Sequence, residues 1–260
     1  MPRLTAIIPV RNRSGTRLRN CLASLRWQLA GTENSSENST EVLGDELEIV
    51  LSDFGSDPEH AASIVALAEH FDAKVARNEE FGDWNRSRAL NLGIQHASAD
   101  YLLCTDADMI FAPNFVSSIL EVHARRPRQA LVVCACSDLP QRVPERDYAL
   151  SDFEWLRAQA DRRKSIGTGA CQSATREFFF HARGYDEAFV HWGSEDTDMR
   201  DRALAYGLEL EWISDRTEMF HQWHPTSRYS RLIQNRKNAI RYFFTRHQVV
   251  KNLDRWGNLG

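Results

Sequence analysis

Two aspartates separated by one residue interrupt an apolar stretch, in Tyr101-Leu-Leu-Cys-Thr-Asp106-Ala-Asp108-Met-Ile-Phe111. An apolar run that ends in polar residues is typical of a buried strand. Carboxylates at a strand end can converge on one divalent cation, because Mg²⁺ and Mn²⁺ prefer oxygen ligands and leave coordination positions open to phosphates. An isolated Asp-x-Asp triplet is equally typical of a solvated turn, so its interpretation depends on the other motifs.

A second acidic group follows a tryptophan and a glycine, in His191-Trp-Gly-Ser-Glu195-Asp196-Thr-Asp198. We expect a helix to begin at Glu195, where the helix dipole stabilises carboxylates, and one interpretation is that Glu195 and Asp196 only cap it. The other interpretation is a sugar-binding site. There, one carboxylate fixes an acceptor hydroxyl and the other takes its proton.

Two histidines stand three residues apart beside a tryptophan, in Met219-Phe-His221-Gln-Trp-His224-Pro225. A lone histidine is usually structural, whereas a pair at this spacing makes metal ligation a second interpretation. Imidazole together with carboxylates favours Mn²⁺ over Mg²⁺. The spacing does not decide whether His221 or His224 is the ligand.

The composition is that of an ordinary soluble protein: 260 residues, of which 42% are hydrophobic and 26% charged. The net charge of -4 gives no argument for a nucleic-acid partner. No apolar run approaches the roughly 20 residues that span a bilayer. The five cysteines are odd in number and three lie in apolar runs, which favours reduced thiols and a cytoplasmic location, including the inner face of the membrane.

Strands and helices are expected to alternate through the first half of the chain. We predict strands at residues 4–10, 47–51, 74–76, 101–105 and 130–136, and helices at residues 17–29, 59–70, 87–95, 114–125 and 195–206, with a loop at 31–40. This alternation predicts an α/β fold with a doubly wound, mostly parallel sheet. Such sheets bind ligands beyond the carboxyl ends of their strands, where the polar clusters at 9–14, 52–57 and 106–108 fall.

A basic helix is expected at residues 227–250. We predict that it packs Leu232, Ile233, Ile240 and Phe244 on the core. The aromatic residues Phe178 to Phe180 and Trp155 are also expected in the core. The alternative for the helix is contact with a polyanionic or lipid-pyrophosphate acceptor, or with an anionic membrane.

Together these motifs resemble inverting GT-A-fold glycosyltransferases. The opening Pro9-Val-Arg-Asn-Arg13, the segment Trp84-Asn-Arg-Ser-Arg-Ala-Leu-Asn-Leu-Gly93 and the block from Trp192 to Asp198 are similar to motifs of the β-1,4-galactosyltransferase family. The segment Glu48-Ile-Val-Leu-Ser-Asp-Phe-Gly-Ser-Asp57 is closer to family 2, and His221-Gln-Trp-His-Pro resembles bacterial chondroitin and hyaluronan polymerases. The resemblance implies a single GT-A (Rossmann-like) domain at 1–225, with a nucleotide-binding half at about 1–110, an acceptor-binding half at about 111–225, and a basic helical extension at 226–260.

The resemblance also implies roles for individual residues. The nucleotide and its phosphates would contact Pro9, Val10, Arg11, Arg13, Asp53, Arg86 and Asp106. Arg88 is a further candidate pyrophosphate contact, and Asp106 would face the ribose or the metal. Asp108 and His221 would hold Mn²⁺, with Mg²⁺ as the alternative.

On the acceptor side, Trp192 would line the pocket, Glu195 would hold the acceptor and Asp196 would be the general base. The implied reaction moves a sugar from a UDP-sugar to a hydroxyl of a glycan, glycoside or lipid-linked acceptor, with inversion to a β-glycoside. Ser52, Phe54 and Ser194 depart from the family pattern, so recognition of the base and the sugar is expected to differ. The alternatives are a non-catalytic sugar-nucleotide- or glycan-binding module and a nucleotidyltransferase; the latter usually has a Gly-rich phosphate loop, which this chain lacks after its first strand.

Overall fold

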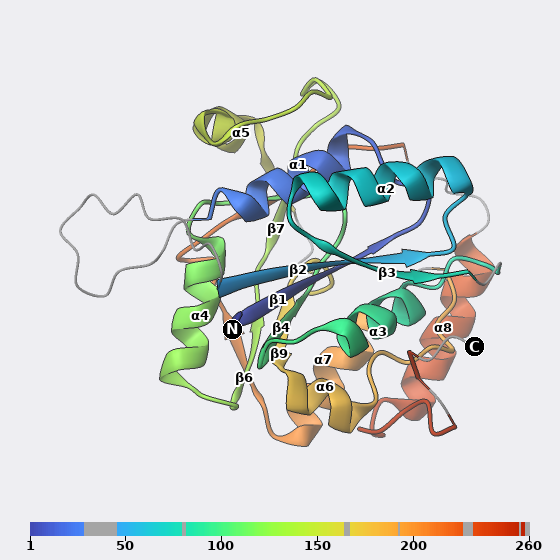
Figure 1. The fold of residues 1–260 in the computed structure, drawn as a ribbon. Helices are drawn as coiled ribbons and strands as arrows, with labels where there is room; N and C mark the ends of the chain where they lie inside the picture. The colour runs from blue at the N-terminus through green and yellow to red at the C-terminus, as the bar shows by residue number, and fades with distance from the viewer. Residues whose placement is uncertain are drawn as a thin grey trace.

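A seven-stranded sheet forms the centre of the fold (Figure 1). The computed structural model describes residues 1–28, 46–79, 82–163, 167–191, 193–225, 231–254 and 256–257, and for 231–234 only the helical backbone. In sheet order the strands are β10 (Glu209–Trp212), β6 (Ala130–Val133), β9 (Gln172–Thr175), β4 (Tyr101–Cys104), β1 (Leu4–Val10), β2 (Leu47–Phe54) and β3 (Lys74–Asn78). Only β9 pairs antiparallel to its neighbours, so the expected mostly parallel sheet is confirmed.

Helices cover both faces of this sheet, as the double winding requires (Figure 1). One face packs against α1 (Thr16–Arg26), α2 (Pro58–His70) and α4 (Phe115–Arg125), and the other against α3 (Arg86–His96), α6 (Arg176–Ala182) and α7 (Glu195–Tyr206). Leu4, Ala6 and Ile8 of β1 join the first core, whereas Ile7 joins the second. This alternation follows from the two-residue side-chain period of a strand.

Gly93 allows α3 to approach the sheet closely. A Cβ atom at this position would lie 2.4 Å from Cγ2 of Ile7 and 3.3 Å from Cβ of Ser52. Any side chain here would push the helix away from β1 and β2. The close approach sets the position of the first turn of α3, which carries Arg86.

A second, four-stranded sheet is formed by β5 (Met109–Phe111), β11 (Met219–His221), β7 (Cys136–Asp138) and β8 (Asp161–Arg162), in that order. The predicted single strand at residues 130–136 was wrong, because the chain leaves the first sheet after β6 and enters the second at β7. The amide of Ala135 donates to Oγ of Ser214 at the crossing, 2.7 Å away. Because the residues on both sides of this crossing are apolar, the hydrophobic pattern of the sequence does not reveal that the chain changes sheets. A short 3-10 helix, η2 (Leu150–Asp152), and α5 (Phe153–Gln159) follow β7.

The C-terminal helix α8 (Arg231–Thr245) is shorter than predicted, and residues 226–230 lie outside the described part of the chain. Ile240 and Phe244 are 59% and 67% exposed, so the prediction that they pack on the core was wrong. The side chains of Leu232 and Ile233 are not described, and neither is the predicted loop at 31–40. Among the described residues, no helix is long and apolar enough to cross a membrane.

The aromatic residues expected in the core divide between core and surface. Phe178 and Phe179 are fully buried, as predicted, whereas Phe180 is 37% exposed. Trp155 is 41% exposed, so its predicted place in the core was wrong. It lies at the edge of a small satellite cluster, 6.3 Å from Tyr148 between ring centroids, where the cluster is too thin to cover an indole.

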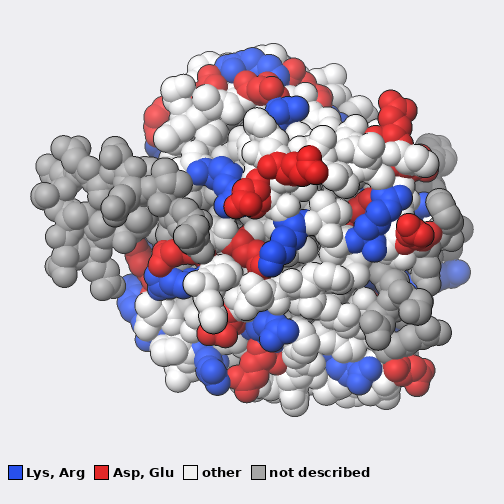
Figure 2. All heavy atoms as spheres, viewed as in Figure 1, with Lys and Arg blue, Asp and Glu red and all other residues white. Residues whose placement is uncertain are grey.

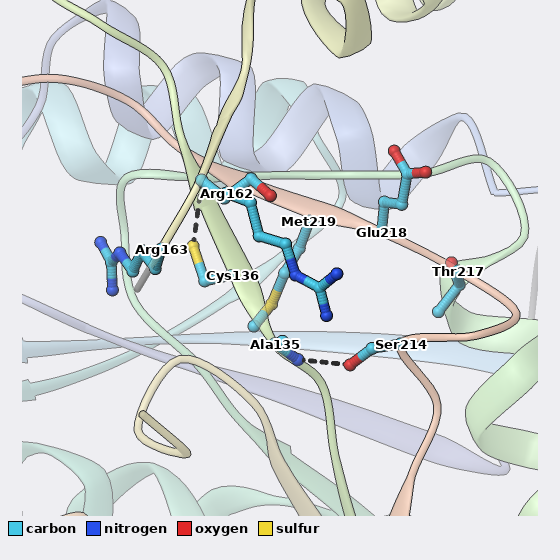
Figure 3. A pocket seen from close by; sticks show the side chains of 9 residues that line it. Ala135, Cys136, Arg162, Arg163, Ser214, Thr217, Glu218 and Met219 are labelled. Carbon is cyan, nitrogen blue, oxygen red and sulfur yellow. Dashed lines mark hydrogen bonds between the residues drawn. The ribbon is translucent and has the colours of Figure 1, made fainter. Parts of the chain in front are cut away.

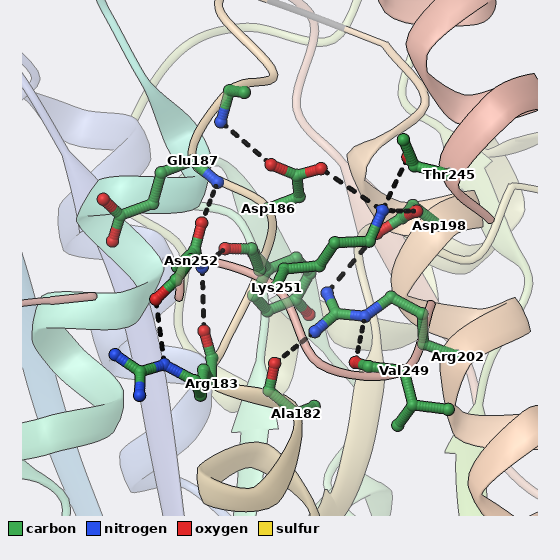
Figure 4. A network of polar contacts seen from close by, with 12 residues as sticks. Ala182, Arg183, Asp186, Glu187, Asp198, Arg202, Thr245, Val249, Lys251 and Asn252 are labelled. Carbon is green, nitrogen blue, oxygen red and sulfur yellow. Dashed lines mark hydrogen bonds and ion pairs between the residues drawn. The ribbon is translucent and has the colours of Figure 1, made fainter. Parts of the chain in front are cut away.

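A buried ionic network ties the end of the chain to α7 (Figure 4). Nζ of Lys251 lies 3.4 Å from Asp198 and 3.5 Å from Asp186. Arg202 lies 3.4 Å from Asp198, and Arg241 binds Asp186 through two bonds of 2.8 and 2.9 Å. Burial raises the pKa of Asp198, against the opposing charges of Arg202 and Lys251. Each buried charge of the network therefore depends on partners within the protein.

Candidate metal and sugar-nucleotide site

Asp106 and Asp108 follow β4 directly and face in different directions. Asp108 is 4% exposed and turns toward the second sheet, whereas the side chain of Asp106 is 34% exposed and turns toward α3. The amide of Thr105 donates to the carbonyl of Ile7, which keeps this segment aligned with β1 after β4 ends. The two carboxylates therefore serve two separate groups of side chains.

Asp108 meets two histidines. Its Oδ2 lies 3.8 Å from Nε2 of His221 and 3.3 Å from Nε2 of His224. The antiparallel register of β5 and β11 places His221 opposite Met109, and the amide of Gln222 donates to the carbonyl of Asp108. Strand pairing thus brings these three side chains together across more than a hundred residues of sequence.

The Nδ1 atoms of both histidines are engaged on the side away from Asp108. Nδ1 of His221 lies 3.1 Å from Oδ1 of Asp138, which Arg163 binds through two bonds of 2.6 and 2.8 Å. Nδ1 of His224 lies 3.1 Å from the carbonyl of Pro225. Because an Nδ1–H bonded in this way leaves Nε2 free as a ligand, both imidazoles are oriented as in known metal sites.

The three ligand atoms fit a divalent cation. One carboxylate oxygen and two imidazole nitrogens lie within 4.8 Å of one another. Burial opposes ionisation of Asp108, but the bond from His224 and the charges of His221 and Arg13 hold its pKa well below the usual range. Burial lowers the pKa of His221, whereas the bond to Asp108 raises that of His224. An ionised carboxylate with mixed oxygen and nitrogen donors favours Mn²⁺ over Mg²⁺.

Arg13 brings a positive charge to this cluster. Its Nη1 lies 2.7 Å from Oδ2 of Asp108, and its side chain is half exposed. Arg11, two residues earlier, donates instead to the carbonyl of Gly82 at 2.5 Å and lies over the ring of Phe54. Both follow β1, in the position where a parallel sheet presents its ligands.

Neighbouring groups of the protein bind the carboxylate of Asp53, which lies at the carboxyl end of β2. It is 1% exposed, accepts from Nη1 of Arg77 at 2.5 Å and from the amide of Ser56 at 3.0 Å. Pro9 and Val10 close β1 next to it, with Val10 in register with Asp53. The structure thus places the predicted nucleotide-binding residues of β1 and β2 side by side.

Arg86 connects Asp106 to the acidic pair of α7. Its Nε donates to Asp106 at 2.8 Å, its Nη2 donates to the carbonyl of Gly169 at 2.8 Å, and its Nη1 lies 4.0 Å from Glu195. Nη1 is buried and makes no hydrogen bond within the described part of the chain. Arg88, the other candidate, points to Glu187 at 3.5 Å and is not brought to this group.

Glu195 and Asp196 begin α7, as predicted. Glu195 is 6% exposed and accepts from the amide of Gly193 at 2.9 Å. Burial raises the pKa of Glu195, opposed by Arg86 and assisted by Asp196. A Cβ atom on Gly169 would lie 3.0 Å from Oδ2 of Asp196, so this glycine leaves room for the carboxylate. Trp192, which was predicted to line the acceptor pocket, lies outside the described residues.

Sequence reasoning missed several residues around these groups. Asp138 and Arg163 orient His221. Asp138 is the last residue of β7 and comes shortly after the apolar run that ends at Cys136, so the rule that singled out Asp106 and Asp108 could have identified it. Gly169 lies in the segment Gly167-Thr-Gly-Ala-Cys-Gln172, whose local sequence indicates only a turn. Contact between Gly169 and Asp196 depends on tertiary packing that no local pattern predicts.

Two cavities border the second sheet. One of about 190 Å³ is lined by β7, Arg162, Arg163 and residues 214–219, and contains no member of the metal group (Figure 3). The other, of about 240 Å³, is lined by Arg17, residues 139–148, Gln222 and Trp223. This second cavity adjoins the segment between the two histidines.

The profile of glycosyl transferase family 2 matches residues 5–186. The chain belongs to glycosyl transferase family 2. The profile described as the N-terminal domain of galactosyltransferase matches residues 157–225, which include Glu195, Asp196 and His221. The two matches together span the regions that carry the acidic and histidine motifs, and they agree with the two families that these motifs resemble.

Two similar proteins are glycosyltransferases by name. Validoxylamine A glucosyltransferase of Streptomyces hygroscopicus subsp. jinggangensis is 24% identical over 238 residues, covering 81% of this chain and 53% of the relative. N-acetylgalactosaminyltransferase 6 of Drosophila melanogaster is 28% identical over 185 residues, covering 63% of this chain and 27% of the relative. The chain thus spans about half, or less, of the length of these relatives.

Solved structures share the fold. GalNAc-T7 with UDP, GalNAc and Mn²⁺ superposes with a TM-score of 0.62 at 18% identity, covering 94% of this chain and 48% of that one. The mannosyltransferase PcManGT from Pyrobaculum calidifontis, in complex with GDP-Man and Mn²⁺, gives 0.59 at 19% identity, covering 92% and 64%. The GT-A fold expected from the sequence is therefore confirmed.

Proposed function

We propose that this chain is a metal-dependent inverting glycosyltransferase that moves a sugar from a UDP-sugar to an acceptor hydroxyl and forms a β-glycosidic bond. The observation that carries the proposal is the convergence of Asp108, His221 and His224, with Arg13 beside them. Arg86 lies between Asp106, two residues before Asp108, and Glu195 of α7. We infer that the donor side and the acceptor side adjoin at the segment from Asp106 to Asp108.

The donor side is proposed to bind the nucleotide diphosphate. Mn²⁺, or Mg²⁺ in its place, would be held by Asp108, His221 and His224, and would act as a Lewis acid for the departing diphosphate. Arg13 supplies a further positive charge for the phosphates. Asp53 is proposed to contact the base or ribose, which requires that the nucleotide displace Arg77 or Ser56 from its buried carboxylate. Two solved structures of this fold contain Mn²⁺ with UDP or with GDP-Man, which supports the ion but leaves the base to be tested.

The acceptor side is proposed to use Glu195 and Asp196 in different roles. Glu195 is held in place by the amide of Gly193 and by Arg86, which suits fixing a hydroxyl. Asp196 is less buried, lies against Gly169 and makes no hydrogen bond through its carboxylate in the described structure, which leaves it available to take a proton. One base and one displacement would invert the anomeric carbon.

The proposed division of the chain has two halves, and the metal site takes Asp108 from the first and both histidines from the second. Residues 1–110 would form the nucleotide-binding half and residues 111–225 the acceptor-binding half, with residues 226–260 as the basic extension. The acceptor is proposed to be a glycan, a glycoside or a lipid-linked sugar. All five cysteines are buried and unpaired, which supports a cytoplasmic location.

Donor hydrolysis without an acceptor tests the proposal. Release of UDP or GDP is measured from a panel of UDP-sugars and GDP-mannose, first with Mn²⁺ and then with EDTA. We expect slow, Mn²⁺-dependent release of UDP from one donor. Release of GDP alone would overturn the UDP assignment, and nucleotide binding without any release, even with acceptors added, would favour a non-catalytic sugar-nucleotide-binding module.

A further inference from the structure

In the described part of the helix α8, several polar side chains are turned inward, whereas the large apolar side chains are turned outward. On the inner side, Asn238 is 1% exposed and donates to the carbonyls of Val190 and Gly193 at 3.1 Å. Arg241 binds Asp186, and the hydroxyl of Tyr242 donates to Asp201. A helix on a water-exposed surface normally has the opposite arrangement, with its apolar stripe on the core.

The outward stripe follows helical spacing. Ile240, Phe243 and Phe244 are 59%, 62% and 67% exposed, three to four residues apart along one side of the helix. Large side chains this exposed, and adjacent to one another, mark an interaction surface rather than ordinary scatter. We call these three residues, with the cations described next, the α8 stripe.

Cations stand at both ends of the α8 stripe. Arg236 and Lys237 are exposed one turn before Ile240, and Arg246 is exposed directly after the helix. The guanidinium of Arg246 lies 5.4 Å from the centre of the Phe243 ring. The helix contains no acidic residue, whereas the face shown in Figure 2 mixes acidic and basic side chains.

We propose that the α8 stripe docks the protein on an anionic lipid surface. Aromatic and aliphatic side chains enter the interface between headgroups and acyl chains, and flanking cations are attracted to anionic headgroups. A second copy of the chain fits less well, because pairing two such stripes would set cations against cations in either orientation. This docking does not depend on glycosyl transfer.

The docked orientation has a consequence for the acceptor side. Because the inner face of α8 bonds to the carbonyls of Val190 and Gly193, a bilayer on its outer face lies about one helix diameter, ~10 Å, from the loop before Glu195. The helix would then lie between the lipid surface and the loop before Glu195.

Vesicle flotation of the full chain tests the docking. The probes are vesicles of phosphatidylcholine alone and of phosphatidylcholine mixed with phosphatidylglycerol, at low and high salt. We expect binding only to the mixed vesicles, weakened by salt, with each cation worth roughly fivefold in affinity. Arg236→Glu with Lys237→Glu should therefore weaken binding by at least about 25-fold, and Phe243→Ser with Phe244→Ser by roughly tenfold or more.

A matched control carries the same change of net charge elsewhere. Arg125→Glu with Arg142→Glu alters exposed residues of α4 and of the segment after β7, and should bind nearly as the wild type does. Because all the altered side chains are exposed, circular dichroism should show native folding for each variant. Failure of the wild type to bind mixed vesicles at low salt, or equal binding by the stripe variants, would overturn the proposal. So would a dimer in sedimentation that Phe243→Ser with Phe244→Ser dissociates.

Discussion

Two clusters of charged side chains in this molecule differ in the kind of side chain that faces their carboxylates. In the first, which holds Asp186, Asp198, Arg202 and Lys251, opposite charges are buried together and tie the chain end to α7. In the second, Asp108 faces two imidazoles whose Nε2 atoms both point toward it. In the first cluster the carboxylates face buried cations of the protein, whereas the second has converging ligand atoms and a half-exposed arginine, which is the arrangement of a binding site.

The comparison teaches that burial and a carboxylate motif do not by themselves mark function. Asp198 belongs to the same motif as Glu195 and Asp196, but its partners, Arg202 and Lys251, are those of a structural anchor. We infer the role of a carboxylate from the side chains that it faces, which are a buried arginine and a buried lysine for Asp198 and two imidazoles for Asp108. Variants of the two clusters should therefore fail in different ways.

The largest expected effect lies at the proposed general base. Asp196→Asn should reduce transfer about 10²- to 10⁴-fold, because the amide cannot take the acceptor proton. Mn²⁺-dependent binding of UDP should persist, since Asp196 contacts none of the proposed metal ligands. Steady-state rates and titration of UDP measure the two effects, and loss of both together would contradict the division between donor and acceptor sides.

Breaking the cluster that holds Asp186, Asp198, Arg202 and Lys251 should lower the stability of the fold. Asp198→Asn removes the ion-pair partner of Arg202 and leaves Lys251 with Asp186 alone. We expect a loss of about 3–5 kcal/mol in the free energy of unfolding. Urea denaturation measures it. Mn²⁺ affinity of the folded fraction should stay unchanged, and a stable variant that lost Mn²⁺ binding would show that the two clusters are not separate.

A smaller effect is expected at the residue that orients His221. Asp138→Asn should weaken Mn²⁺ binding by about 10- to 100-fold, because the carboxylate that fixes the imidazole is lost. Asp152→Asn is a matched control, since Asp152 also forms an exposed pair with an arginine, Arg146, but lies away from the histidines. Calorimetric titration should separate the two variants, and equal affinities would refute the orienting role.

The smallest effect is the pH dependence of metal binding. The pKa of His224 is raised above its ordinary value of 6.5 by Asp108, and that of His221 is lowered by burial. As pH falls through the pKa of His224, a proton competes with the metal, so affinity should drop by up to about tenfold per pH unit. His221 should add its proton only at lower pH. Titrations of wild type and His224→Gln should therefore differ in the pH at which the decline begins, and the same onset in both would exclude His224 as a ligand.

The sequence predicted most strands and helices of the first half, because polar residues bound the apolar runs of the strands and the helices have helical spacing. The short strand β5 was not predicted. The prediction failed at residues 130–136, where an unbroken apolar run passes from one sheet to the other. It also failed at α8, where Ile240 and Phe244 have the spacing of a core-facing stripe but face outward. In both places the local pattern is compatible with two arrangements, and long-range contacts decide between them.

For the candidate site, the sequence identified the residue types but not their partners. Asp108 and His221 were expected to share a metal, and strand pairing of β5 with β11 is what brings them close. Arg86 was expected at the pyrophosphate, yet its position between Asp106 and Glu195 could come only from the packing of α3 and α7. These assignments stay predictions until they are tested with ligands.

Mn²⁺ binding by wild type and Asp108→Asn tests the central difference between the two clusters most directly. Electron paramagnetic resonance counts bound Mn²⁺, thermal unfolding follows stabilisation by the ion, and circular dichroism verifies that the variant is folded. We predict one Mn²⁺ per wild-type chain, with a rise in the unfolding temperature on adding the ion. The folded variant should show neither effect. Undiminished Mn²⁺ binding by Asp108→Asn, or no binding by the wild type even with UDP present, would contradict the account.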